Sequence, residues 1–288
     1  MKKLILSFVI LVTGWSVNAQ DEGLFWKVTN ANGEASYLFG TYHLMGSKFV
    51  EEDRKEVLEA YNSSERVIVE MVLDSAKLPS LMSYYVMPGK SLKAMCSEED
   101  YALIKEKIEP NLGAPLSAMD FMKPAVLSMT YTLALLEEAT PDSSRREGMP
   151  IDLYFAEQAE QKGKAVIALE TMEEQMEVLL NTESPEEQLE ELLDQLKNEE
   201  RSMADAKALV AAYVSDDLSM IKGLGDEYED QTGNMDALVV KRNQNWIPKL
   251  SEVLDQGKSF VAVGALHLTG EDGLIELLRA EGYTLEAL

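Results

Sequence analysis

Two histidines are the only imidazole side chains in this chain of 288 residues, and both follow the same local pattern. Each ends a Gly-x-x-His sequence after an apolar run, at His43 near the start of the chain and at His267 near its end. Imidazole acts near neutral pH as a general acid, a general base or a metal ligand. One such histidine is typical of a structural residue. A matched pair that uses every histidine favours one shared functional site.

Two glutamates lie in comparable apolar segments. Glu70 interrupts the run 66–73, and Glu170 follows the run 165–169. A buried carboxylate is unfavourable unless it is paired or bound to a metal. Glu70 is therefore a candidate catalytic residue, with a salt bridge at the sheet end as the alternative. Glu170 is a second candidate, with a helix-start carboxylate that the helix dipole stabilises as the alternative.

Arg242 and Asn243 lie side by side on the helix expected before the last strand, one turn ahead of Trp246. A guanidinium can hold a substrate carboxylate or stabilise an oxyanion. We therefore expect Arg242 and Asn243 to be catalytic residues. An acid-paired surface arginine is the alternative.

Two imidazoles and a carboxylate are a common ligand set for a divalent transition metal with an open position for water. His43, His267 and Glu70 provide such a set, and manganese, cobalt or zinc would suit it. The metal would lower the pKa of bound water and polarise a carbonyl. Ligating imidazoles need a further group that fixes the tautomer. Thr41, Tyr42 or a backbone carbonyl could serve.

Other catalytic motifs are absent from the sequence. It has no Gly-x-Ser-x-Gly elbow, no Gly-rich phosphate loop and no His-Glu-x-x-His helix. Cys96 is the only cysteine, so no internal disulfide can form.

Short apolar runs alternate with helical patterns along the chain. Strands are expected over 25–28, 36–39, 66–73, 165–169, 258–263 and 283–288. Helices are expected over 51–63, from Ser184 to about Tyr213, over 234–254 with Pro248 inside, and over 270–280. The alternation predicts an α/β fold, with a mixed central sheet flanked by helices and a large helical insertion in the middle of the chain. Ligand sites in such sheets lie beyond the carboxyl ends of strands, where both histidines are expected.

The N-terminal residues have the pattern of a secretory signal peptide. Lys2 and Lys3 precede the apolar run 4–12, and the small-residue end 17–19 predicts cleavage after Ala19. The alternative is an uncleaved anchor, but the run is shorter than the roughly 20 residues of a membrane span. We expect residues 20–288 to form one domain, in the periplasm of a bacterium or secreted from it, without stable membrane insertion after signal removal.

The formal net charge of −25 disfavours nucleic acid as a partner, because like charges repel at long range. The expected partner is a peptide or small-molecule substrate.

Several motifs together resemble the TraB/GumN family, to which the Tiki proteases are related. They are the segment 37–43, Val69-Glu70, the segment 148–152, the segment 164–171 with Gln175, Arg242-Asn243, and the segment 263–268 with Gly282-Tyr283. The resemblance covers nearly all of the expected mature chain.

The resemblance implies an active-site core of His43, His267 and Glu70, with Arg242 and Asn243 beside it. It also implies the activity of the Tiki relatives, which are regarded as metal-dependent peptidases that clip short N-terminal peptides. The sequence departs from the family pattern where Pro150 and Ile151 precede Asp152, so the pattern assigns no role to Asp152.

The combined expectation is an exported, metal-dependent hydrolase that acts on peptides. One alternative is a metal-independent, esterase-like hydrolase in which the histidines act as general base and acid. Another is a non-catalytic protein that binds metal, haem or peptide. Glu70 has a clear use in hydrolysis and none in a haem pocket, which favours the hydrolase.

Overall fold

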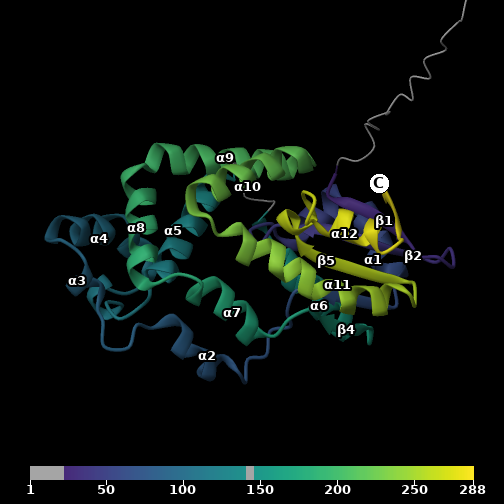
Figure 1. The fold of residues 1–288 in the computed structure, drawn as a ribbon, viewed down its shortest axis with the longest axis horizontal. Helices are drawn as coiled ribbons and strands as arrows, with labels where there is room; N and C mark the ends of the chain where they lie inside the picture. The colour runs from purple at the N-terminus through teal and green to yellow at the C-terminus, as the bar shows by residue number, and fades with distance from the viewer. Residues whose placement is uncertain (1–22, 141–145) are drawn as a thin grey trace, which may run out of the picture.

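The computed structural model describes residues 23–140 and 146–288. A six-stranded mixed sheet occupies the right half of the molecule in Figure 1. The expected signal peptide lies outside the described residues. The strand order is β4-β3-β5-β2-β1-β6. The strands are β1 (Phe25–Thr29), β2 (Ala35–Thr41), β3 (Arg66–Val69), β4 (Ala165–Ala168), β5 (Ser259–Gly264) and β6 (Thr284–Ala287). The first four in the sheet order are parallel to one another, while β1 and β6 pair antiparallel. The predicted α/β class is confirmed.

The third strand is shorter than its apolar run. The run extends over 66–73, but β3 ends at Val69, where its pairing with Ala168 of β4 and Ala262 of β5 ends. Glu70 therefore follows the strand and does not lie within it.

Helices cover both faces of the sheet. On one face lie α1 (Lys55–Ser63) and α6 (Ile151–Gln161), whose Tyr61 and Phe155 rings pack on Phe260 of β5 at centroid distances of 5.6 and 4.8 Å. The short π-helix η1 (Phe49–Asp53) precedes α1, so the predicted helix over 51–63 is divided in two. On the other face lie α11 (Lys241–Leu254) and α12 (Leu274–Ala280) (Figure 1). Pro248 lies inside α11 without ending it.

The remaining helices form a helical region beside the sheet, on the left of Figure 1. It comes from two insertions, one after β3 and one after β4. The first contains α2 (Leu78–Tyr85), α3 (Leu92–Met95), α4 (Glu98–Leu112), η2 (Leu116–Ala118) and α5 (Pro124–Ala139). The second contains α7 (Met172–Asn181), α8 (Pro185–Lys197), α9 (Glu199–Val214), α10 (Leu218–Thr232) and η4 (Asp236–Val240). No helix within 23–140 and 146–288 is long and apolar enough to cross a membrane.

The single helix predicted from Ser184 to about Tyr213 is wrong. The helix is interrupted at Asn198, where φ is −110° and ψ is 42°, and the chain continues as a second helix. The break allows α8 and α9 to pack against the same helix, α5. The apolar faces of α8 and α9 are thus both buried against α5, which a single straight helix would not allow.

The carboxyl ends of four adjacent parallel strands meet at one edge of the sheet. These strands are β2, β3, β4 and β5. His43, Glu70, Glu170 and His267 each follow one of these ends within three residues. The topology thus brings side chains from distant parts of the sequence to one place.

Candidate active site

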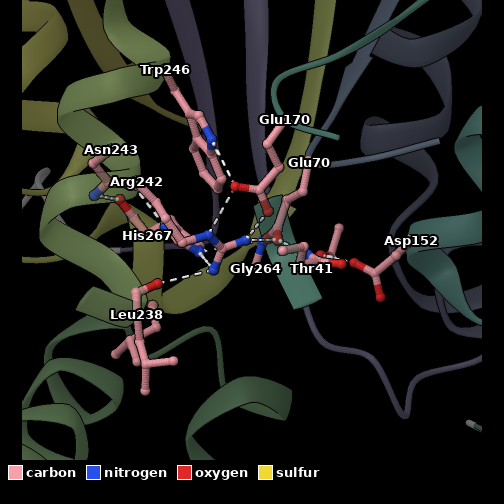
Figure 2. Close-up of polar contacts among 12 residues, drawn as sticks. Thr41, Glu70, Asp152, Glu170, Leu238, Arg242, Asn243, Trp246, Gly264 and His267 are labelled. Atoms are coloured by element: carbon pink, nitrogen blue, oxygen red, sulfur yellow. Dashed lines mark hydrogen bonds and ion pairs between the residues drawn. The ribbon is translucent and has the colours of Figure 1, made fainter. Parts of the chain in front are cut away.

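Arg242 lies at the centre of the polar side chains at this edge (Figure 2). Its Nε and Nη2 donate to the two oxygens of Glu170 at 3.1 and 2.6 Å, and Nη2 also donates to Glu70 Oε2 at 2.7 Å. Its Nη1 donates to the Leu238 carbonyl at 2.9 Å and faces His267 Nε2 at 3.1 Å. A guanidinium has five N–H groups, and each of the five has a partner here.

Glu170 anchors the guanidinium. Its carboxylate is buried, binds Arg242 through both oxygens, and accepts a hydrogen bond from the Trp246 indole at 3.3 Å. The Trp246 ring also lies 4.8 Å from the centre of the Arg242 guanidinium. The carboxylate therefore has a defined partner in the site, beyond any interaction with the helix that follows it.

Glu70 is almost enclosed, and both of its oxygens have partners. Oε1 accepts the Gly264 N–H at 2.7 Å, and Oε2 accepts from Gln175 at 3.1 Å as well as from Arg242. Burial by itself would raise the pKa of Glu70. The positive charges around it, together with the Gly264 N–H, instead hold the pKa at about 2. Glu70 is therefore ionised at neutral pH.

His267 is buried, and its tautomer follows from its contacts. Asn243 donates its amide N–H groups to the carbonyls of His267 and Asp272 at 3.0 and 2.8 Å, which turns its Oδ1 toward His267 Nδ1 at 2.7 Å. Nδ1 therefore carries the proton, and Nε2 accepts from Arg242. Burial lowers the pKa of His267 to about 4, so the ring is neutral at neutral pH.

His43 differs from His267 in exposure and in charge. Its side chain is 69% exposed, and its Nδ1 lies 2.8 Å from Asp152 Oδ2. The Asp152 carboxylate raises the pKa of His43 to about 9, which makes the ring positively charged at neutral pH. Within the described residues no hydrogen bond engages its Nε2. His43 is close enough for its charge to act on Glu70 and His267.

Asp152 is a site residue to which sequence reasoning gave no role. It lies in the first turn of α6, and its second oxygen accepts a hydrogen bond from the Thr41 hydroxyl. Thr41 thus holds Asp152, and it is Asp152 that holds the imidazole. Tyr42 does not contact the ring through its hydroxyl, which is buried and has no hydrogen-bond partner among residues 23–140 and 146–288. The sequence signals for Asp152 were its place at the start of a helix and within the segment 148–152, which is part of the family resemblance.

Two loops bring Asp152 to His43. The segment 45–48 pairs with 147–151 through backbone hydrogen bonds, including Ser47 N–H to the Met149 carbonyl at 2.7 Å and Ile151 N–H to the Met45 carbonyl at 2.9 Å. A Cβ on Gly46 would lie 2.0 Å from the Glu147 carbonyl oxygen. Only glycine permits this approach, so Gly46 contributes to the site through the backbone.

The donors proposed for a metal do not assemble around one. Within 23–140 and 146–288, no three His, Cys, Asp or Glu side chains are placed to hold a metal ion. His267 Nε2 and Glu70 Oε1 are 3.7 Å apart, but Arg242 already contacts both residues. A metal on Nε2 at about 2.1 Å along the same lone pair would collide with Nη1. Glu70 and His267 in this arrangement therefore do not fit a shared metal.

Comparisons with known proteins agree with the resemblance seen in the sequence. The chain is 25% identical to the metalloprotease TIKI2 of Danio rerio over 300 residues, which cover 87% of this chain and 58% of that protein. It is 24% identical to TIKI2 of Xenopus tropicalis over 305 residues, which cover 87% of this chain and 57% of that protein. The chain thus spans less than two thirds of the length of these relatives. No solved structure matches it significantly. The model of the TraB/PrgY/gumN family matches residues 24–287, and this chain belongs to that family.

Proposed function

We propose that this chain is a hydrolase that cleaves amide bonds in peptides, and that His43 transfers the proton. One observation carries the proposal. The exposed His43 ring is held at Nδ1 by Asp152, while its Nε2 makes no hydrogen bond to the described residues. A histidine oriented by a carboxylate is a common general acid and base. The family and its metalloprotease relatives support peptides as the substrate class.

In this mechanism the neutral form of His43 takes a proton from a water molecule at Nε2, and the oxygen of that water adds to the carbonyl carbon. Asp152 stabilises the imidazolium that forms. The imidazolium then returns the proton to the leaving nitrogen as the carbon–nitrogen bond breaks. All five N–H groups of Arg242 are engaged, so its role is to hold Glu70, Glu170 and His267 in place and to supply a fixed positive charge.

The sequence also predicted a divalent transition metal. No step of this mechanism passes through one, because Glu70 and His267 are bound to Arg242. The relatives are named metalloproteases, so the assay below includes chelator and added manganese, cobalt or zinc. Recovery of cleavage by one of these ions after chelation would identify the cofactor.

We also propose that the protein acts outside the cytoplasm, in the periplasm or the medium, on peptides and without nucleic acid as a partner. The signal-like pattern of the first 19 residues and the net charge of −25 support this. Fractionation of cells that express the full chain tests it: recovery of the whole protein from the cytoplasm would contradict export.

The activity is tested by digestion of a peptide library with the wild type and with His43→Ala, each with and without chelator. We expect the variant to lose roughly 10²- to 10⁴-fold in rate, which is the range for loss of a general acid–base group. Lys27→Ala is the matched control, because Lys27 lies on β1 and pairs with Glu286 away from the site. Equal cleavage by His43→Ala would rule out this role for His43.

A further inference from the structure

The cluster around Arg242 contains two largely buried carboxylates and a neutral imidazole. The negative charge of these carboxylates must be balanced by a cation. Glu70 and Glu170 are both ion-paired to the guanidinium, with side-chain exposures of 12% and 7%. His267 presents the lone pair of its Nε2 to the same guanidinium. Two anions buried together are stable only with a compensating positive charge.

We infer that Arg242, and not a metal ion, is the resident cation held between Glu70, Glu170 and His267. Glu70, Glu170 and His267, whose side chains are of types that bind metals, each accept a hydrogen bond from it. The fifth hydrogen bond, to the Leu238 carbonyl, fixes the guanidinium in the plane that faces them. This inference holds whether or not the chain cleaves peptides.

The position of the guanidinium is set from outside the cluster. The Trp246 ring lies 4.8 Å from the centre of the guanidinium and 4.4 Å from the centre of the His267 ring, so it supports both side chains. Arg242 and Trp246 lie one turn apart on α11, and Leu238 lies in η4 immediately before it. One continuous helical segment therefore fixes the guanidinium in place. A metal ion could bind Glu70, Glu170 and His267 only by displacing the guanidinium from its hydrogen bonds.

Metal binding by the wild type tests the inference directly. Because the chain has only two histidines, their ring signals can be followed separately by NMR in protein prepared without a polyhistidine tag. We titrate the purified protein with cobalt chloride and, in parallel, with zinc chloride. We expect diamagnetic zinc, which perturbs mainly the ring that it binds, to leave the His267 signals unchanged at ion concentrations that fill ordinary protein sites. Any broadening confined to the exposed His43 agrees with the inference, since Arg242 does not contact that ring.

Removal of the guanidinium gives the complementary test. Arg242→Ala leaves two carboxylates and an imidazole lone pair around the vacated space, which is a good ligand set for a divalent ion. We expect about one bound ion per chain and an affinity at least roughly 100-fold tighter than in the wild type, because a fixed charge near a dication is removed. Arg242→Lys keeps a positive charge and should not gain this affinity. Arg54→Ala is the matched control, because Arg54 also pairs with two carboxylates, Glu56 and Asp216, but faces no imidazole.

Two results would overturn the inference. One is stoichiometric zinc binding by the wild type with a shift of the His267 signals. The other is a folded Arg242→Ala protein, as judged by circular dichroism, that binds no more metal than the wild type. If Arg242→Ala does not fold, the wild-type titration still decides the question. Because these readouts measure binding, a failure of the inference is distinguishable from a failure of the proposed peptidase activity.

Discussion

Asp152 and Asn243 give the two imidazoles opposite protonation states at neutral pH. Asp152 places a negative charge on Nδ1 of an exposed ring and raises the pKa of His43 to about 9. Asn243 offers only a neutral oxygen to a buried ring, and burial lowers the pKa of His267 to about 4. His43 can therefore exchange protons with a substrate, whereas His267 acts as a fixed acceptor for Arg242.

Replacement of Asp152 tests this assignment. In Asp152→Asn we expect the pKa of His43 to fall from about 9 toward the ordinary 6.5, because the charge that stabilises the imidazolium is gone. The neutral form that acts as a base should then dominate at a lower pH. The ascending limb of the pH–rate profile should shift to lower pH, with a maximal rate lower by about 10²-fold.

An NMR titration of the two imidazoles measures the shift, with Asp120→Asn as the control. Asp120 accepts a backbone hydrogen bond from Lys93, far from the site in sequence and without a histidine partner. A His43 pKa that is the same in Asp152→Asn as in the wild type would show that Asp152 does not set it.

At the scale of elements, a second pair of carboxylates joins three parts of the helical region. Glu183 precedes α8, Glu191 lies within it, and Asn234, after α10, donates to the two at 2.6 and 3.2 Å. Burial and the neighbouring Glu183 raise the pKa of Glu191 to about 7. Asn234 also begins the segment that leads through η4 to Arg242, so the pair lies at the base of the element that carries the guanidinium.

The Glu191 pKa predicts how stability depends on pH. The folded state holds its proton up to about pH 7, while the unfolded state releases it near the ordinary 4.5. Between these values the folded state binds more protons, so stability falls as pH rises and the loss is complete above about 7. In Glu191→Gln, the free energy of unfolding should differ much less between pH 5 and pH 8 than it does in the wild type.

Urea midpoints of the wild type and of Glu191→Gln at both pH values measure the effect. Glu190→Gln is the matched control, because Glu190 is an exposed neighbour on the same helix. The prediction fails if Glu191→Gln and Glu190→Gln keep the same pH dependence as the wild type.

At the scale of the whole molecule, acidic residues outnumber basic ones, 51 to 26. The resulting negative potential attracts cationic substrates and repels anionic ones, and salt screens it with a Debye length of about 8 Å at 0.15 M. The charges of the site residues act over short distances, whereas the net charge of the whole surface affects the rate at which a charged substrate meets the protein.

Two peptides that share a scissile bond but differ in charge test this effect. We expect kcat/KM for the lysine-rich peptide to exceed that for the glutamate-rich peptide at low salt, and the ratio to fall toward one as sodium chloride is added. A neutral peptide with the same bond is the control and should change little. A ratio independent of salt would show that long-range charge does not guide binding.

The strand and helix pattern predicted the α/β class, and five of the six strands were placed within about two residues at each end. Local signals carried this information: apolar runs define buried strands, and the capping sequence Ser184–Glu187 marks the start of α8. The same local signals failed at Asn198 and at residues 71–73. Both boundaries depend on packing partners, α5 in the first case and the neighbouring strands in the second, and a local window contains neither.

The sequence by itself determined which groups were available: two imidazoles in matched turns, one glutamate within an apolar run and one after another, and one Arg-Asn pair. Only the tertiary structure decided what each group faces. Strand order placed four strand ends at one edge, and the pairing of 45–48 with 147–151 delivered Asp152 to His43. The reason is physical: a side chain's charge and hydrogen bonds depend on neighbours from distant parts of the chain, 109 residues away for His43 and Asp152 and 172 for Arg242 and Glu70, and no local pattern encodes their distance.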